Sequence, residues 1–306
     1  MLAIILGFGC AMAFATNAVV TRRGVLRASS NYIATISILT GPIFFLLVAG
    51  VTKGLSQIGQ FPWKAYLFLA LSGVVHFALG RTWAYKSIQL IGTNRSYMVT
   101  SLYPIVSIGL AIIILGETIK PLMIFGILCS LSSPFITFFK EQTISGTTHL
   151  MGNSHGKEVD RHTLYLGMLY GMGAAVFWGS SFIFIKLGLE NGGSPVAGSL
   201  LAYLGASIAI IPSLLNRENK REMFEADRKS LRLGLLGGLT ANIAQLLRYL
   251  ALGYGSVIMV TVLMRTSPLW VLLLSFIYNR EYESFSRWVL LSNALLIVGT
   301  VLILIV

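Results

Sequence analysis

The sequence repeats itself: residues 3–15 read AIILGFGCAMAFA, and residues 167–179 read GMLYGMGAAVFWG. A shift of 164 positions places small residues on small residues: Ala3 on Gly167, Gly7 on Gly171, Ala11 on Ala175 and Ala15 on Gly179. Without gaps, the same shift matches Gly41 with Gly205, Gly73 with Gly237, Tyr85 with Tyr249, Pro104 with Pro268 and Glu117 with Glu281. Such a duplication in an apolar chain is typical of transporters, in which two equivalent halves rock around a shared central site.

The composition excludes a soluble domain. Mean hydropathy is +0.78, and charged residues are only 11% of the 306 residues, whereas a soluble domain has about 25%. Ten apolar stretches are long enough to cross about 30 Å of hydrocarbon as helices: 2–20, 31–51, 65–85, 96–115, 121–139, 164–186, 195–215, 231–252, 257–278 and 287–306. Strands of a membrane barrel would instead read as about ten alternating residues. The sequence therefore predicts an all-α integral membrane protein with ten transmembrane helices.

The repeat divides the chain into two halves of five helices each. Residues 1–140 form the first half, the polar residues 141–163 form a linker, and residues 164–306 form the second half. Because five is an odd number, the second half starts on the opposite side of the membrane, and the two repeats are inverted. We expect a multi-pass protein of the cell membrane. The sequence does not define its oligomeric state, and a monomer is compatible with it.

Basic residues are distributed unevenly between the two sides. The net charge of +12 would favour nucleic acid as the partner of a soluble protein, but here the charges lie in loops, and we expect no nucleic acid. Loops after odd-numbered spans hold sixteen Lys and Arg residues, and loops after even-numbered spans hold four. By the positive-inside rule, this count places the odd loops in the cytoplasm and both termini outside.

Two motifs recur in the chain. The sixth span contains Ala175-Val176-Phe177-Trp178-Gly179, and in each half twelve residues separate a proline from a glutamate: Pro104 from Glu117, which follows Gly116, and Pro268 from Glu281. Over nearly its whole length the chain thereby resembles the drug/metabolite transporter superfamily, EamA type. It departs from the pattern at Ala15-Thr16, where Trp-Gly would be expected, and at Arg280, which precedes Glu281 in place of glycine. The resemblance implies a transporter of small metabolites with both termini in the cytoplasm, contrary to the charge count.

Three arginines lie inside predicted spans: Arg81, Arg248 and Arg265. An arginine in hydrocarbon costs at least about 2.5–3.5 kcal/mol on insertion scales, so each must face a cavity or a partner. Arg81 and Arg248 lie near span ends, from which they could also snorkel to the interface, whereas Arg265 lies mid-span. No Asp or Glu lies mid-span to pair with them. These arginines predict a substrate with a carboxylate or phosphate group, bound through forked hydrogen bonds.

Polar and aromatic residues of the spans complete a candidate substrate site. Besides the three arginines, it comprises Asn17, His76, Tyr97, Ser101, Trp178, Gln245 and Tyr249. Any one of these could instead form an interhelical contact. Pro104 and Pro268 interrupt helical hydrogen bonding, which predicts either fixed kinks or hinges that move during transport. Glu117 and Glu281 lie at the membrane edge; we interpret them as structural acids at helix ends, with proton coupling as the alternative.

Motifs for catalysis or cofactor binding are absent. The sequence has no His-Glu-x-x-His, no nucleotide-binding glycine loop and no carboxylate pair within a span, so we expect no enzyme and no cofactor. The linker histidines His149, His155 and His162 lack metal-ligand spacing, so no metal site is expected.

The prediction is a secondary transporter that moves a small organic metabolite across the lipid bilayer by alternating access. The favoured substrate has an anionic group, as in an amino acid or a phosphorylated metabolite. The alternatives are an exporter of neutral or cationic compounds and a multi-span protein without transport, such as a receptor or a lipid-handling enzyme.

The orientation is testable in cells. We expect cytoplasmic termini, as the resemblance implies, so that the charged loop 216–230 faces the outside. A membrane-impermeant thiol reagent should then label a single cysteine introduced into this loop in intact cells. Protection of that cysteine until the cells are permeabilised would support the charge count instead.

Overall fold

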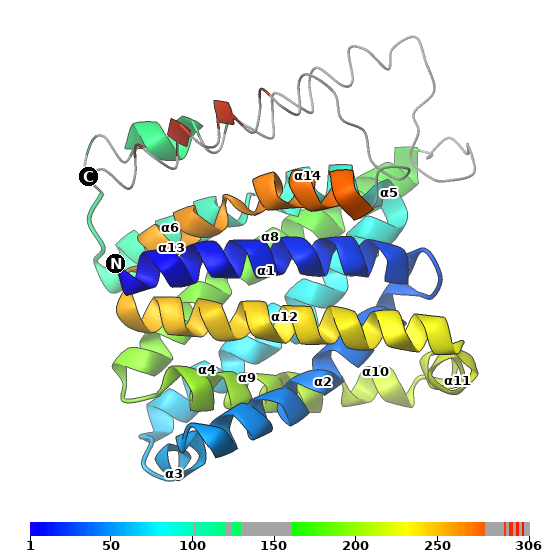
Figure 1. Cartoon of the computed structure of the whole chain (residues 1–306), viewed down its shortest axis with the longest axis horizontal. Coiled ribbons are helices and arrows are strands. Elements are labelled where there is room, and N and C mark those ends of the chain that lie inside the picture. The colour runs from blue at the N-terminus through cyan, green and yellow to red at the C-terminus, as the bar shows by residue number, and fades with distance from the viewer. Residues whose placement is uncertain are drawn as a thin grey trace.

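The computed structural model describes residues 1–100, 102–119 and 161–278, and also 121, 124–129, 132, 291, 294–295, 298–299 and 302. In chain order the helices are α1 (Leu2–Val25), α2 (Ser30–Val51), α3 (Gly54–Ile58), α4 (Trp63–Gly73), a π-helical segment (Val74–Arg81), α5 (Thr82–Thr100), α6 (Tyr103–Leu115), α8 (Arg161–Glu190), α9 (Pro195–Ala209), α10 (Ile211–Leu215), α11 (Arg217–Glu225), α12 (Arg228–Tyr254), α13 (Val257–Met264) and α14 (Ser267–Tyr278). The described residues contain no strand. The long helices run along the horizontal of Figure 1, and most of their connections collect at its two ends.

Seven helical stretches among the described residues are long and apolar enough to cross a membrane. They are Leu2–Val25, Ser30–Val51, Trp63–Ile91, His162–Glu190, Pro195–Leu215, Arg228–Tyr254 and Val257–Tyr278. Each overlaps one predicted span, which supports an all-helical protein with several spans. The predicted spans 121–139 and 287–306 fall mostly outside the described residues.

The predicted span 96–115 is not one continuous helix. α5 ends at Thr100 and α6 begins at Tyr103, so that Pro104 lies in the first turn of α6, where proline costs no helical hydrogen bond. The predicted loop 86–95 is helical instead, because α4, the π-helical segment and α5 follow one another without interruption. Residues 63–100 contain no proline that would end the helix earlier. Lys86 and Arg95, which the charge count assigned to a loop, therefore belong to α5.

The first helix of each half packs against the other half. α1 contacts α12, α13 and α14, whereas α8 contacts α4, α5 and α6. The 164-residue shift relates the two sets. It matches α12 and α13 with the continuous helix that runs from α4 to the end of α5, and it matches α14 with α6. α2 and α9, which the shift also matches, contact each other. Figure 1 shows α1 and α12 side by side across the middle of the molecule.

Polar contacts join the two halves at the end of the molecule where α11 lies (Figure 1). Ser29 caps the N-terminus of α2, and both its amide (2.7 Å) and its hydroxyl donate to the carboxylate of Glu222 on α11. Asp227 caps α12 by accepting a hydrogen bond from the amide of Ser230 (3.0 Å). Hydrogen bonds from Ser230 hold the pKa of Asp227 below its usual value. The predicted loop 216–230 therefore contains α11 and the capped start of α12.

One matched pair of glycines differs in its surroundings. A methyl group added at Gly73 would lie 1.8 Å from the backbone oxygen of Ala202, so α4 and α9 touch through their backbones here. A methyl group added at Gly237 would have Thr21 Oγ1 as its nearest neighbour, at the ordinary contact distance of 3.6 Å. The close packing of the first half thus requires a glycine that the second half does not require.

We predict that Gly73→Ala destabilises the protein and that Gly237→Ala does not. The added methyl group at position 73 must push α4 away from α9, and overpacking of this kind costs about 1–3 kcal/mol. At position 237 the replacement should be neutral or stabilising, because alanine favours a helix by about 1 kcal/mol over glycine. Thermal unfolding of both variants in one detergent measures the difference. Equal melting temperatures would contradict the close approach at Gly73.

Candidate functional site

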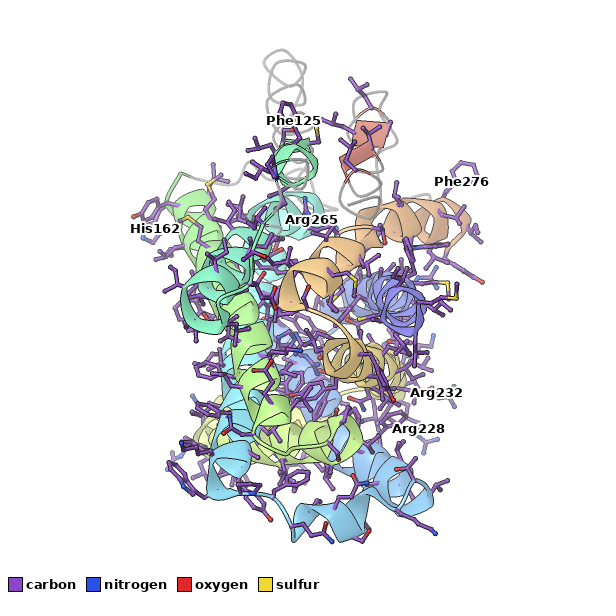
Figure 2. The ribbon with its side chains drawn as sticks, turned by 90° about the vertical axis from the view of Figure 1, so that its left-hand side faces the viewer. Phe125, His162, Arg228, Arg232, Arg265 and Phe276 are labelled. Carbon is purple, nitrogen blue, oxygen red and sulfur yellow. The ribbon has the colours of Figure 1, made fainter. Side chains whose placement is uncertain are left out.

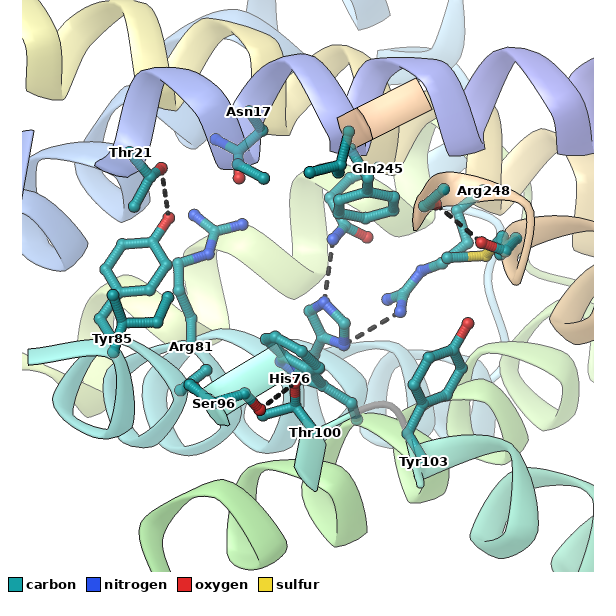
Figure 3. Close-up of a pocket in the computed structure, with 18 of the residues that line it drawn as sticks. Asn17, Thr21, His76, Arg81, Tyr85, Ser96, Thr100, Tyr103, Gln245 and Arg248 are labelled. Carbon is teal, nitrogen blue, oxygen red and sulfur yellow. Dashed lines mark hydrogen bonds between the residues drawn. The ribbon is translucent and has the colours of Figure 1, made fainter. Parts of the chain in front are cut away.

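A cavity of about 130 Å³ lies between the two halves (Figure 3). An engineered cavity of similar size, about 150 Å³, binds benzene, so the space can hold a small organic molecule. Its wall is mostly apolar, with the following polar and aromatic side chains: Phe14, Asn17, Thr21, Arg22, His76, Arg81, Tyr85, Ser96, Thr100, Tyr103, Trp178, Phe182, Gln245, Arg248, Arg265 and Ser267. Among the described residues of the wall, four are arginines and none is acidic.

The cavity extends toward one end of the helices only. The part of α1 that lines it runs from Phe14 to Arg22, in the second half of that helix. Toward the start of α1 the space is filled, because Leu263 packs directly on Gly7 and both Leu252 and Val257 are fully buried. The site is therefore closed toward the end of the molecule where α1 begins.

The arginine of the predicted ninth span lies at a break in its helix. Arg265 and Thr266 separate α13 from α14, so the span 257–278 consists of two short helices. Pro268 has no N–H for the carbonyl of Met264, and the hydroxyl of Ser267 donates to that oxygen instead (2.7 Å). The predicted effect of Pro268 on the helix is thus found as a complete break rather than a bend.

The two helix breaks occupy matching positions and both border the cavity. Leu102 precedes α6, and the 164-residue shift carries it onto Thr266, which precedes α14. Thr100 and Tyr103 lie on either side of the first break and line the cavity, as Met264 and Ser267 do at the second. Inside a membrane, irregular backbone is tolerated only within protein or beside a water-filled cavity. The breaks therefore mark the place where a polar site can exist.

All three arginines of the spans are buried. Arg81 and Arg265 are each 4% exposed, and Arg248 is 0% exposed. Burial rules out snorkelling, which would bring the charged groups to the surface. Figure 2 shows Arg265 among the ribbons, whereas Arg228 and Arg232 lie along the outer edge.

The π-helical segment carries two of the predicted site residues, His76 and Arg81. Such segments widen a helix locally and are frequent at functional sites. The guanidinium of Arg81 donates to Ser37 Oγ (3.0 Å) and to the hydroxyl of Tyr203 (3.1 Å), and it lies over the ring of Phe77. Arg81 therefore joins the π-helical segment to α2 and α9 at the edge of the cavity.

His76 is the centre of a second polar cluster, which Figure 3 shows between Gln245 and Arg248. Its Nδ1 lies 2.9 Å from Arg248 Nη1 and 2.9 Å from Ser181 Oγ, and its Nε2 lies 2.9 Å from the side-chain amide of Gln245. Trp178 stacks on the imidazole, with 5.9 Å between ring centroids. Four predicted residues from three spans are thus in contact at the cavity wall.

The other predicted site residues have different positions. Asn17 lines the cavity and donates to the carbonyl of Gly237 (2.7 Å). Tyr249 does not line the cavity; it is fully buried, and its hydroxyl lies 2.7 Å from Ser72 Oγ. Ser101, Glu281 and the side chains of Tyr97 and Pro268 lie outside the described residues.

Several residues of the wall were not predicted. Tyr85 lies on the wall, and its hydroxyl is 3.3 Å from Thr21 Oγ1. The repeat matched Tyr85 with Tyr249, which could have drawn attention to it. Thr100 and Tyr103 could have been inferred from their place beside Pro104, but only if the helix break had been located first.

Two charged residues hold the junction between α12 and α13, at the closed end of the cavity. Glu117 accepts hydrogen bonds from the amides of Val257 (2.7 Å) and Ile258 (3.0 Å), in the first turn of α13. The ammonium of Lys186 donates to the carbonyls of Leu252 (3.3 Å) and Gly255 (3.2 Å), at the end of α12. Each charge faces the helix end of opposite polarity. This arrangement supports the interpretation of Glu117 as a structural acid.

We predict that Glu117→Ala lowers the stability of the protein by about 1–3 kcal/mol, because it removes two hydrogen bonds to first-turn amides of α13 and a charge–dipole contact. Glu117→Gln should lose less, since the amide oxygen still accepts one hydrogen bond. Thermal unfolding measures both, with Glu225→Gln on the exposed surface of α11 as the control. A proton-coupling role would be indicated instead if Glu117→Gln kept full stability but abolished the pH dependence of uptake.

The comparisons with known proteins bear on the whole chain. The EamA-like transporter family matches residues 1–139 and 165–305. No curated protein matches the chain. A crystal structure described only as that of a protein has a TM-score of 0.72, covers 98% of this chain and 95% of its own, and is 16% identical, which shows a shared fold alone. Proteins of this family are generally not enzymes. The chain belongs to the EamA-like transporter family and is a multi-pass integral membrane protein.

Proposed function

We propose that this EamA-family transporter is a secondary transporter that moves a small organic metabolite with an anionic group, such as an amino acid or a phosphorylated metabolite, by alternating access. The proposal includes ten spans in two inverted halves of five. The observation that carries it is the cavity between the halves, whose described wall contains four arginines and no acidic residue. Among the described residues of this cavity a cationic substrate would meet only like charges, so an anionic group is the better match.

Both halves contribute to the proposed substrate site. His76 and Arg81 come from the first half, and Trp178, Arg248 and Arg265 come from the second. A site of this kind changes its exposure when one half rocks against the other, because its two walls then move relative to each other. The proposal does not depend on Tyr249, whose hydroxyl lies in the packed interior.

Alternating access needs one closed end and elements that can move. The closed end is held by Glu117 and Lys186 at the α12–α13 junction, through contacts to backbone atoms. The helix breaks beside Thr100 and Arg265 are the proposed hinges, because a chain without continuous helical hydrogen bonding changes its φ and ψ angles most easily. In the opposite state, we expect the contacts of Glu117 and Lys186 to loosen while the end near Arg22 closes.

We predict saturable uptake of at least one organic anion into proteoliposomes that contain the purified protein. The panel includes carboxylates, amino acids, phosphorylated metabolites, and neutral and cationic compounds, each measured against protein-free vesicles. Preferred transport of a neutral or cationic compound would replace the anionic substrate by the alternative. If no compound moves, the transport proposal fails, and the alternative of a multi-span protein without transport takes its place.

For a transported anion, we predict that Arg265→Gln raises the half-saturation concentration about tenfold or more, because a charge-assisted hydrogen bond contributes about 1.5–3 kcal/mol. Arg265→Lys should recover only part of the loss, since lysine keeps the charge but not the planar fork. Purified yield and melting temperature serve as folding controls, and Arg221→Gln on the exposed side of α11 serves as the matched arginine control. Unchanged transport by Arg265→Gln would remove this residue from the site.

A further inference from the structure

The buried arginines of the cavity wall differ in how many partners they have. Both terminal nitrogens of Arg81 are occupied, one by Ser37 and one by Tyr203. In Arg248 only Nη1 is occupied, by His76 Nδ1 and, at 3.4 Å, by Ser181 Oγ. The Nε and Nη2 atoms of Arg248 are buried and have no hydrogen-bond partner among the described residues. The terminal nitrogens of Arg81 are therefore occupied by side chains of the protein itself, whereas Arg248 has donors left over.

The two remaining donors of Arg248 lie on one edge of its planar guanidinium. The N–H groups of Nε and Nη2 point in the same direction with the spacing of the two oxygens of a carboxylate. A buried charged donor without a partner is rare in native proteins and calls for a ligand or water at that position. Solvent does not reach either atom in this structure, so a ligand binds there once neighbouring side chains have moved aside. The rings of Phe182 and Tyr249, 5.0 and 5.8 Å from the guanidinium carbon, compensate the charge only in part. A water molecule can accept hydrogen bonds from these donors, but it cannot neutralise the charge of the guanidinium.

Resting on the proposed function, we propose that this edge of Arg248 binds the carboxylate of the substrate, and that the site selects organic acids of net negative charge over amino acids of the same carbon skeleton. The proposal thus narrows the substrate from any metabolite with an anionic group to a carboxylate without a free ammonium group.

The neighbours of Arg248 hold its guanidinium in the orientation that this binding requires. Arginine is always a donor, so His76 Nδ1 must accept its hydrogen bond, which places the histidine proton on Nε2. Nε2–H then needs an acceptor, and the oxygen of Gln245 is the only atom of the contacting amide group that can accept. The amide of Gln245 is placed the other way round, with its nitrogen at His76 and its oxygen buried without a partner among the described residues. Exchanging the two atoms gives Nε2–H its acceptor and makes the –NH₂ group of Gln245 one more donor at the cavity wall.

The unsatisfied groups of the wall are mostly donors. Besides the Arg248 edge and the Gln245 amide, Trp178 Nε1 and Arg22 Nε are buried donors without a partner among the described residues. An α-ammonium group beside the bound carboxylate would bring three more donors and a positive charge into a wall with four arginines and no described acid. Like charges in a medium of low dielectric constant repel strongly. The same carbon skeleton without the amino group avoids this cost.

The size of the cavity and the free edge of Arg248 favour a small carboxylate. The space of about 130 Å³ is similar to the cavity of about 150 Å³ that binds benzene in an engineered protein, so it suits a small molecule. The largely apolar wall suits a hydrocarbon body, and the unoccupied guanidinium edge of Arg248 suits one planar carboxylate. A phosphate group presents three oxygens, which one edge satisfies incompletely.

The test is a binding experiment with matched pairs of compounds on the purified full-length protein in detergent. The pairs are butanoate and 2-aminobutanoate, 4-methylpentanoate and leucine, and 3-phenylpropanoate and phenylalanine, with phenethylamine and benzyl phosphate as further probes. Isothermal titration gives the dissociation constants. We expect at least one acid to bind at least tenfold more tightly than its amino analogue and more tightly than benzyl phosphate. If no acid exceeds its amino analogue, or if none of the acids binds, the proposal is wrong.

Variants of Arg248 test whether the preferred acid binds at this residue. Arg248→Gln should weaken binding of the preferred acid tenfold or more, and Arg248→Lys should recover part of it, whereas the surface variant Arg221→Gln should bind as the unmodified protein does. Normal acid binding by Arg248→Gln would overturn the assignment. Should the Arg248 variants fail to fold, the comparison of acids with amino analogues on the unmodified protein still decides the selectivity. Binding without flux in proteoliposomes would refute the transport proposal alone, and flux that favours amino acids would refute the present one alone.

Discussion

The architecture depends on one constraint: in hydrocarbon, every backbone N–H and C=O must find a partner within the protein. Long uninterrupted helices meet it by themselves, whereas helix ends and helix breaks do not. At the α12–α13 junction, which connects two spans at the end of the molecule where α1 begins, the carboxylate of Glu117 and the ammonium of Lys186 replace the missing helical partners. At the second helix break, the hydroxyl of Ser267 does so for Met264. A polar cavity exists because side chains supply what the interrupted backbone lacks.

The membrane-spanning segments were predictable because hydrophobic length is a local property. Seven of the ten predicted spans overlap helices of the described residues that are long enough to cross a membrane. The boundaries near the third and fourth spans were not predictable in the same way. Polar residues around Lys86 were interpreted as a loop, yet a polar stretch without proline can continue a helix inside protein packing, and α5 does so. The prolines indicated the two irregular positions, but the sequence did not show that the helices stop completely there.

The candidate site was predictable in kind but not in detail. The cost of a charge in hydrocarbon was enough to select Arg81, Arg248 and Arg265, and all three line the cavity. Their separate roles depend on contacts between residues far apart in the chain: Tyr203 is 122 positions from Arg81, and His76 is 172 positions from Arg248. No pattern along one helix specifies such contacts. For the same reason the sequence placed Tyr249 at the site, whereas its hydroxyl faces Ser72 in the packed interior.

The contacts of Arg81 and Lys186 also constrain the order of biogenesis. The ribosome delivers Arg81 to the bilayer 122 residues before Tyr203, and Lys186 precedes the carbonyls of Leu252 and Gly255 by 66 and 69 residues. During synthesis each cation must therefore wait in the membrane, or in the insertion machinery, without the partner that later holds it. The first half cannot reach its final packing until α9 has entered the bilayer, and α8 cannot do so before α12 has entered. Insertion helix by helix must be followed by a joint closing step, in which both halves of the nascent protein become stable together.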